Sequence, residues 1–287
     1  MATLRKIRRQ IQSVKNIQQI TKAMYMVAAA KLRRAQQEME SSRPYSQTLD
    51  EIISRVMFRT EKRDYPLLQT REGKRTELLV FSSDRGMCGA FNKNIIRSAE
   101  LFLEEAESKG QEASLVTVGK KASEYFKKHN VKLTRQYLNP EREVSLQKAI
   151  GIADEVIQRF VSGEVDAVNI LYSVFHSPMV QRPTIVELLP FKPRKQLQIV
   201  RVDYLYEPDP GTLLDQLLPW HVRMQVFQAM LETRASELGA RMSSMDLATK
   251  NAGDLIQGLT LKMNRARQES ITKELLDIVT GAEALKR

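Results

Sequence analysis

Residues 224–266 contain a seven-residue repeat that indicates the architecture of the chain: MQVFQAMLETRASELGARMSSMDLATKNAGDLIQGLTLKMNRA. Two series of mostly apolar residues, each spaced by seven, alternate there at intervals of four and three. The first series is Met224, Leu231, Leu238, Met245, Ala252, Leu259 and Ala266, and the second is Ala235, Met242, Thr249, Ile256 and Met263. This heptad pattern predicts a long helix in a left-handed coiled coil. Ile271, Leu275 and Ile278 extend the apolar character towards the C-terminus.

The other end of the chain carries a matching stripe in residues 3–57. Its apolar positions recur at intervals of three or four and are Leu4, Ile7, Ile11, Val14, Ile17, Ile20, Met24 and Val27. This spacing predicts a helix with Thr3 as its N-cap. We expect Pro44 to kink the helix rather than end it, because the apolar pattern continues beyond it. About 55 helical residues would reach on the order of 80 Å, so this helix needs a partner of similar length.

The two terminal helices are the simplest partners for each other. Each has one apolar stripe, and helices at opposite ends of a chain most simply pair antiparallel around a folded middle. The seam mixes small and flexible side chains with Leu and Ile, and such seams specify oligomeric state weakly. The pair could be a structural hairpin, or it could be a long lever that other subunits grip.

The middle of the chain has a different pattern, since nine of the ten prolines lie in residues 66–219. Short apolar runs at 78–81, 114–118 and 168–172 alternate with helical stretches at about 92–109, 120–129 and 145–161. This alternation predicts a parallel α/β layer. Two further runs, at 184–189 and 197–202, are expected to form additional, antiparallel strands.

The predicted fold class is therefore α/β. We expect a long antiparallel two-helix coiled coil from the N- and C-terminal segments with an inserted Rossmann-like α/β domain. The expected divisions are an N-terminal coiled-coil helix at 1–60, a central α/β domain at 75–205 and a C-terminal coiled-coil helix at 211–287.

The charge of the chain is strongly basic and unevenly distributed. Its 287 residues carry a net charge of +11, from 45 Lys and Arg against 34 Asp and Glu. Residues 1–60 alone hold 12 basic and 4 acidic residues. Nucleic acid is the usual first guess for a basic protein, but its binding modules add aromatic platforms or a compact recognition helix. This segment has only Tyr25, Tyr45 and Phe58, and a basic helix can equally face acidic protein loops.

Several classes of protein and site are excluded. No run of 18 apolar residues exists, so no membrane-spanning helix is predicted. Cys88 is the single cysteine, which excludes an internal disulfide and a multi-cysteine zinc site. The three histidines lie too far apart for a local metal motif. The basic start could imitate a mitochondrial transit peptide, but its helical pattern runs far past the length of one.

The best candidate for chemistry is the loop SSDRGMCGAFN at 82–92, between a predicted strand and a predicted helix. Its backbone N–H groups could approach a phosphate. However, the spacing of Gly86 and Gly89 matches neither a P-loop nor a dinucleotide fingerprint, so a tight βα turn is favoured. We interpret Asp84 and Arg85 as turn and surface contacts, and Cys88 as a small packing residue.

Catalytic constellations are not found in the sequence. Adjacent carboxylates at 104–105 and 154–155 are typical of solvated helix faces. We therefore predict no catalytic residue, no cofactor and no metal site in this chain. The residues leave three hypotheses: a shaft, a nucleic-acid-binding protein that salt-dependent DNA affinity would favour, and a nucleotide-using α/β enzyme that a ligand titration could exclude.

Five segments carry a specific likeness to one family. They are ITKAMYMVAAAKL at 20–32, SDRG at 83–86, YLYEPDP at 204–210, ARMSSMDLATKNA at 240–252 and NRARQESITKE at 264–274. These segments resemble the gamma subunit of F-type ATP synthases, and the likeness covers nearly the whole chain. The chloroplast form of the family carries a regulatory insert with two cysteines, which this chain lacks, so the bacterial type fits best.

The resemblance implies a rotor without a catalytic residue of its own. In that family one copy of the coiled coil forms an asymmetric shaft inside a hexamer of alternating alpha and beta subunits. The α/β domain sits with the epsilon subunit and the ring of membrane c subunits. Ion flow turns ring and shaft, with a proton as the expected ion, and the asymmetric shaft drives each beta subunit through different nucleotide affinities. The implied location is the cytoplasmic face of the bacterial plasma membrane.

The resemblance also implies ten subunit-contact residues. They are Met24, Asp84, Arg85, Tyr204, Tyr206, Glu207, Arg241, Arg267, Gln268 and Thr272. Met24 would pass acidic loops of the beta subunits, and a longer cationic side chain there should bind too tightly and impair coupling. Residues 267, 268 and 272 would meet the catch loops of the alpha and beta subunits.

The remaining positions have implied roles lower on the shaft. Residues 204, 206 and 207 would belong to a foot on the c-ring, and Arg241 would lie where the coil emerges from the hexamer. Met24 and Met242 also fit the apolar seam, and for Met242 a role in the seam is favoured over a contact with another subunit.

Overall fold

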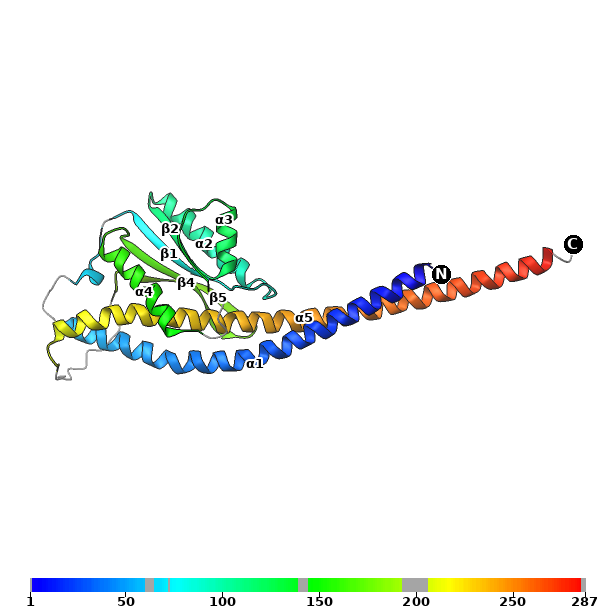
Figure 1. The fold of residues 1–287 in the computed structure, drawn as a ribbon, viewed down its shortest axis with the longest axis horizontal. Helices are drawn as coiled ribbons and strands as arrows, with labels where there is room; N and C mark the ends of the chain where they lie inside the picture. Colours follow the sequence, from blue (N-terminus) through cyan, green and yellow to red (C-terminus); the bar gives the residue numbers. More distant parts are fainter. Residues whose placement is uncertain (1, 60–64, 72, 139–143, 193–205, 285–287) are drawn as a thin grey trace. The chain divides into compact units, whose positions relative to one another are not determined.

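The chain folds into long helices and a mixed sheet, as a computed structural model shows for residues 2–59, 65–71, 73–138, 144–192 and 206–284 (Figure 1). The helices are α1 (Ala2–Arg59), the short 3-10 helix η1 (Pro66–Leu68), α2 (Phe91–Ser108), α3 (Lys120–Lys128), α4 (Leu146–Val161) and α5 (Pro210–Ala284). The strands are β1 (Arg75–Phe81), β2 (Glu112–Val118), β3 (Leu133–Tyr137), β4 (Ala167–Ser177) and β5 (Val180–Leu189).

The sheet has five strands in the order β3-β2-β1-β4-β5. β1 pairs in parallel with β2 and β4, and β2 pairs in parallel with β3. β5 returns antiparallel along β4. The three predicted parallel strands and the antiparallel strand at 184–189 are confirmed. The strand expected at 197–202 lies outside the described residues.

Alternate residues of β1 serve the two faces of the sheet. Leu78 and Val80 pack with α2 and α3, whereas Leu79 and Phe81 pack with α4 and with parts of α1 and α5. All four side chains are at most 1% exposed. A strand buried on both faces is nearly continuously apolar, which is why the run at 78–81 was readable from the sequence.

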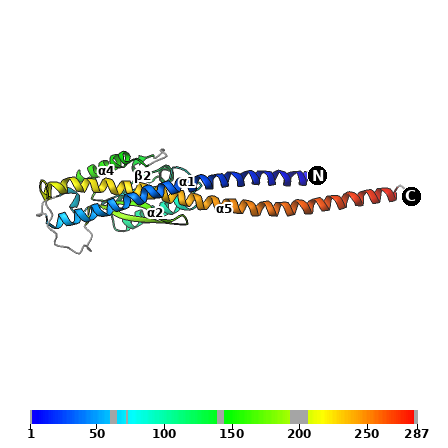
Figure 2. The same ribbon diagram turned by 90° about the horizontal axis from the view of Figure 1, so that it is seen from below.

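Both long helices contribute to each of two compact units. Unit 1 comprises residues 1–28 and 242–287, and unit 2 comprises residues 29–241. Unit 2 therefore holds the sheet, the helices α2, α3 and α4, residues 29–59 of α1 and residues 210–241 of α5. In unit 1 the N-terminal part of α1 lies beside α5, and α5 continues past the N-terminal end of α1 (Figures 1 and 2).

The two long helices run antiparallel within each unit. In unit 2, Arg43 bonds to Glu232 and Ser46 is bonded by Gln225, so rising numbers on α1 meet falling numbers on α5. Pro44 lies inside α1 and does not end it, as expected. The N-cap predicted at Thr3 is wrong, because α1 already begins at Ala2.

The heptad seam of α5 is confirmed along its length. Met224, Leu231, Ala235, Leu238, Met245 and Ala252 are buried, and the other six positions are partly buried. The predicted fold class is confirmed with it: long N- and C-terminal helices pair antiparallel and carry an inserted sheet that is mostly parallel.

The stripe predicted on α1 is correct to Val14 and at Met24, which is partly buried, but it is wrong at three positions after Val14. Ile17, Ile20 and Val27 are half exposed or more, at 50%, 59% and 55%. The buried residues are instead Thr21 and Ala28, one position further along the helix. In the seam of unit 1, the Oγ1 atoms of Thr21 and Thr249 are 2.8 Å apart. Small residues allow this close approach, so they take the seam and leave the larger apolar residues outside.

Candidate functional site

The exposed surface of α1 in unit 1 combines apolar and cationic side chains. We call Ile17, Ile20 and Val27 the α1 outer stripe. Met24 belongs to the same helical row and is partly buried. Residues 1–28 also contain six Lys and Arg and no Asp or Glu. This surface can therefore offer an apolar strip within a positive field, which suits a partner with acidic residues around an apolar contact.

The predicted contact residues near the end of α5 are open to solvent. Arg267, Gln268 and Thr272 are exposed, and Thr272 Oγ1 donates a hydrogen bond of 2.9 Å to the Gln268 carbonyl. A hollow of about 430 Å³ is lined by Arg265, Gln268, Glu269, Thr272, Lys273 and Leu276. Since all six belong to one helix, the hollow is the groove between successive turns and not an enclosed cavity.

The same part of α5 also carries apolar side chains that are exposed. They are Ile271, Leu275, Leu276, Ile278 and Val279, with exposed fractions from 50% to 68%. A helix with this much exposed apolar surface is typical of a binding segment. Sequence reasoning found the apolar pattern, and the structure adds that the rest of unit 1 leaves it uncovered.

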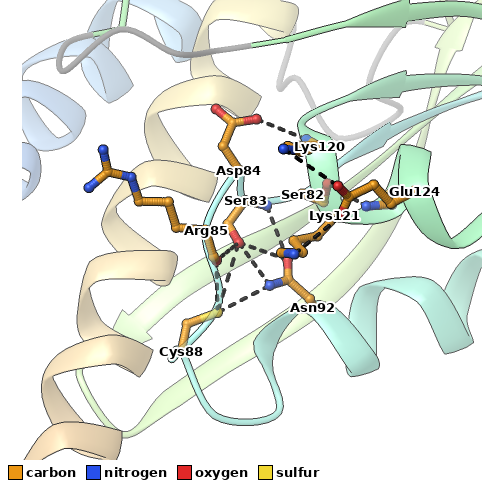
Figure 3. A network of polar contacts seen from close by, with 10 residues as sticks. Ser82, Ser83, Asp84, Arg85, Cys88, Asn92, Lys120, Lys121 and Glu124 are labelled. Atoms are coloured by element: carbon orange, nitrogen blue, oxygen red, sulfur yellow. Dashed lines mark hydrogen bonds and ion pairs between the residues drawn. The ribbon is translucent and has the colours of Figure 1, made fainter.

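The loop after β1 joins this strand to α2 in unit 2, and its polar side chains bond to one another and to the start of α3 (Figure 3). Asp84 Oδ1 accepts a hydrogen bond of 2.8 Å from the backbone N–H of Lys120, at the start of α3. Ser82 Oγ accepts another of 3.1 Å from Ala122 N. These bonds satisfy two donors that the first turn of a helix leaves free. The interpretation of the loop as a βα turn is confirmed, and Asp84 acts as a cap from a neighbouring loop.

Ser83 and Asn92 hold the two ends of this loop together. Asn92 Oδ1 accepts a bond of 3.1 Å from Ser83 N, and the Asn92 amide donates one of 2.8 Å to Ser83 Oγ (Figure 3). The Asn92 amide also donates to Cys88 Sγ at 3.1 Å. Arg85 is exposed, although its carbonyl accepts from Ser83 Oγ at 2.7 Å. The role of Asn92 was missed, because nothing in its sequence context distinguishes it from a surface asparagine.

The thiol of Cys88 is buried and packs with Phe91 and Ala240. Burial raises the pKa of this thiol above its ordinary value, and the hydrogen bond with Ser83 opposes the rise without reversing it. The interpretation of Cys88 as a packing residue is confirmed, because a reactive cysteine needs the opposite shift.

The raised pKa of Cys88 predicts slow alkylation. At pH 7 we expect iodoacetamide to modify the folded chain at least about tenfold more slowly than the chain in urea, because burial limits both thiolate formation and access. Above the ordinary thiol pKa the unfolded rate levels off while the folded rate still climbs, so the ratio should narrow. Mass spectrometry of timed samples measures both rates, and equal rates at pH 7 would contradict a buried thiol.

Arg241 connects the same loop to α5. Its Nη1 lies 2.7 Å from Glu237 Oε1, and its Nη2 donates a bond of 3.2 Å to the carbonyl of Gly86. The Arg241 side chain is only 13% exposed. The structure thus places this predicted contact residue in an intramolecular link, with a small part of its guanidinium accessible.

The motif before α5 divides between a core residue, an exposed residue and a helix cap. Tyr204 lies outside the described residues. Tyr206 is partly buried and packs against the apolar core that contains Leu79 and Phe81, whereas Glu207 is exposed. Asp209 Oδ1 accepts bonds from Gly211 N at 2.9 Å and Thr212 N at 3.0 Å. Asp209 is therefore the N-cap of α5, a role that its position directly before Pro210 could have indicated.

Two searches of the described part of the chain bear on other kinds of site. Within it, no three His, Cys, Asp or Glu side chains are grouped so that they could hold a metal ion. Nor does any helix there combine the length and apolar character needed to cross a bilayer.

Comparison with known proteins gives one consistent result. A family model described as ATP synthase matches residues 3–285. The chain is 46% identical to the ATP synthase gamma chain of Geobacter metallireducens over 287 residues, which is all of both chains. It is 45% identical to that of Anaeromyxobacter sp. (strain Fw109-5), again over the full length of both.

Solved structures support the same fold. A chain of the Tetrahymena thermophila mitochondrial ATP synthase central stalk and c-ring structure is 26% identical, with a TM-score of 0.61, over 80% of this chain and 99% of that one. A chain of the Euglena gracilis mitochondrial ATP synthase, in rotational state 3, has a TM-score of 0.69 at 23% identity, over 99% and 95% of the two chains.

Proposed function

Because this chain belongs to the ATP synthase gamma chain family, we propose that it is the central rotor shaft of a proton-translocating F-type ATP synthase. As part of the complex it would couple rotation of the c-ring to ATP formation from ADP and phosphate. The full-length identity of 45–46% to bacterial gamma chains carries this proposal. The paired helices and inserted sheet agree with it.

The proposed partners follow from the same relationship. One copy of the chain joins a hexamer of alpha and beta subunits, the epsilon subunit and the c-ring. The chain contributes no catalytic residue and binds no nucleic acid. The complex acts at the cytoplasmic face of the bacterial plasma membrane, where this chain is a peripheral subunit. The proposed division of the chain is an N-terminal coiled-coil helix at 1–60, a central α/β domain at 75–205 and a C-terminal coiled-coil helix at 211–287.

The mechanism requires a shaft that is not symmetric. Its two helices differ, because residues 1–28 are basic whereas residues 242–282 hold near-equal numbers of basic and acidic groups. Such a pair presents a different surface to each of three surrounding beta subunits. A rotor shifts their nucleotide affinities only through contacts that differ between their conformations. Turning the pair therefore changes which beta subunit receives the cationic side.

The ten contact residues keep their proposed roles. Met24 and the α1 outer stripe face acidic loops of the beta subunits. Arg267, Gln268 and Thr272 meet the catch loops of the alpha and beta subunits, and their exposure supports this. Arg241 contributes what its intramolecular link leaves accessible. Asp84, Arg85, Tyr204, Tyr206 and Glu207 complete the proposed contacts.

Reconstitution with purified alpha and beta subunits tests the proposed function. We expect the chain to join their hexamer in a one-to-three ratio to each subunit and to raise its ATPase activity. Size-exclusion chromatography and a coupled ATPase assay measure the two outcomes. If the chain neither joins the hexamer nor changes its ATPase activity, the proposal is wrong.

Removal of residues 268–287 should weaken torque without unfolding unit 2. All but one of residues 268–282 are exposed, so their loss should change the stability of unit 2 by no more than about 0.5 kcal/mol. The rotor should nevertheless turn an attached load more slowly, because contacts at its end are lost. Urea unfolding followed by Trp220 fluorescence and single-molecule rotation measure the two effects. Unfolding of unit 2 on truncation would contradict this assignment.

A further inference from the structure

Glu232 of α5 is a buried carboxylate that joins three elements of unit 2. Its side chain is 5% exposed. Oε1 accepts two bonds from Arg43 of α1, at 2.9 Å from Nε and 2.7 Å from Nη2. Oε2 accepts a bond of 2.9 Å from the backbone N–H of Phe175 in β4. One side chain thus ties both long helices to the sheet.

Arg43 closes this arrangement into a triangle. Its Nη2 also donates a bond of 3.3 Å to the carbonyl of Phe175. Gln228, one turn before Glu232 on α5, donates a further bond of 3.2 Å to Oε1. Each corner of the triangle, on α1, α5 and β4, is therefore bonded to the other two.

The same face of α5 continues the contact with the sheet. Ser236, fully buried one turn after Glu232, donates a bond of 2.8 Å from Oγ to the Ser173 carbonyl. At Gly239 an added Cβ would lie 3.0 Å from a ring carbon of Phe175 and 3.1 Å from Pro178 Cα. Residues 232, 236 and 239 share one face of a helix, and along it α5 lies directly against β4.

The hydrogen bonds around Glu232 can fix the position of the helices relative to the sheet, which apolar packing alone does not do. Apolar packing is non-directional and tolerates small sliding of packed helices, whereas hydrogen bonds to fixed backbone groups define one register. A buried charged pair is also weak evidence for stability, because apolar residues of similar volume often stabilise as well. A role in specifying position accounts for a carboxylate at this place.

We propose that Glu232 is a positioning residue that fixes the sheet to both long helices in one angular register, so that torque passes between them without slip. This inference rests on the proposed rotor function, in which the hexamer acts on the helix pair and the c-ring acts on the foot of the α/β portion. Loosening the junction lets the sheet shift against the helices when the rotor works against a load.

The test uses the assembled complex in proton-tight vesicles. ATP hydrolysis and ATP-driven acidification are measured on the same preparation for the wild type, Glu232→Ala and Glu232→Gln. In Glu232→Ala, acidification per ATP hydrolysed should fall at least about twofold, and the fall should grow as the proton gradient rises. For Glu232→Gln the acidification per ATP should lie between the values for the wild type and Glu232→Ala, because the amide oxygen of Gln can still accept a hydrogen bond from Phe175 N.

Asp166 provides a matched control within the same unit. Its carboxylate is 6% exposed, accepts 3.2 and 3.1 Å bonds from the Arg75 guanidinium and a 3.0 Å bond from Arg75 N. These bonds join β1 to the start of β4 and involve neither long helix. Asp166→Ala should therefore lower the yield of complex while leaving acidification per ATP unchanged.

The outcomes separate the two proposals. An unchanged ratio in Glu232→Ala, or an equal fall in Asp166→Ala, overturns the role of Glu232. A wild-type complex that hydrolyses ATP without acidifying the vesicles overturns the proton-translocating rotor function instead. If Glu232→Ala does not assemble, Glu232→Gln and Ser236→Ala carry the test, and each must lower the ratio for the proposal to stand.

Discussion

Replacement of Glu77 by alanine is expected to lower the free energy of unfolding of unit 2 by about 3–5 kcal/mol. Glu77 lies in the central strand β1 and is fully buried. Its two carboxylate oxygens accept bonds of 2.8 and 3.0 Å from the guanidinium of Arg159 in α4, which is 8% exposed. Alanine would leave that cation buried with only the long 3.8 Å contact from its Nη1 to Glu155, which is 45% exposed. The cost of a poorly compensated buried charge exceeds the worth of the pair.

Urea unfolding followed by the fluorescence of Trp220 measures this effect, since Trp220 is the only tryptophan and lies in unit 2. Glu105→Ala is the control, because Glu105 forms an exposed pair with Lys109 that is worth at most about 1 kcal/mol. The double change Glu77→Leu with Arg159→Met should recover most of the loss. Equal midpoints for Glu77→Ala and Glu105→Ala would show that the buried pair does not carry this energy.

Replacement of Gly119 by valine should destabilise unit 2 by about 3 kcal/mol or more. Gly119 has φ of +115° at the start of α3, a conformation that a β-branched residue does not adopt without strain. An added Cβ would also overlap the backbone carbonyl of Ser82 and lie 2.7 Å from Ser82 Oγ. Neither neighbour can move freely, because Ser82 N bonds to the Val118 carbonyl and Ser82 Oγ caps α3.

Gly86→Ala is the matched control for this change. Gly86 lies in the loop next to Ser82, but no atom lies within 4 Å of a Cβ built there. Its substitution should change the unfolding free energy by no more than about 0.5 kcal/mol. The same fluorescence titration compares the two variants. A Gly119→Val chain as stable as Gly86→Ala would mean that the β2–α3 turn relaxes more easily than its contacts indicate.

The sequence predicted those parts of the fold in which a pattern of apolar residues was compatible with a single type of secondary structure. The heptads on α5 continued over many turns, so the seam from Met224 to Ala266 was unambiguous. The run at 78–81 was apolar at every position, which is typical of a parallel strand covered on both faces. The exposed residues 267, 268 and 272 were found by resemblance alone, because no local pattern marks a polar helix surface as a contact.

The candidate site was predicted less completely, because its polar residues act through partners distant in sequence. Asp84 caps a helix that begins 36 residues later. Glu232 bonds to Arg43, which lies 189 residues away. Neither has a local signature, since a carboxylate in a helical or loop segment is most often solvated. Arg241 was identified by its motif, but its bond to the Gly86 carbonyl was not.

Sequence alone was enough to predict most of the helices and strands, though not β3, as well as the antiparallel pairing of the two long helices and the location of the positive charge. These properties depend on residues near one another along the chain. The side of α1 that meets α5 was set by the packing of the two helices against each other. The sequence offered Ile17 and Ile20 for that seam, yet Thr21 and Ala28 occupy it, because the distance between two helix axes depends on the side chains of both.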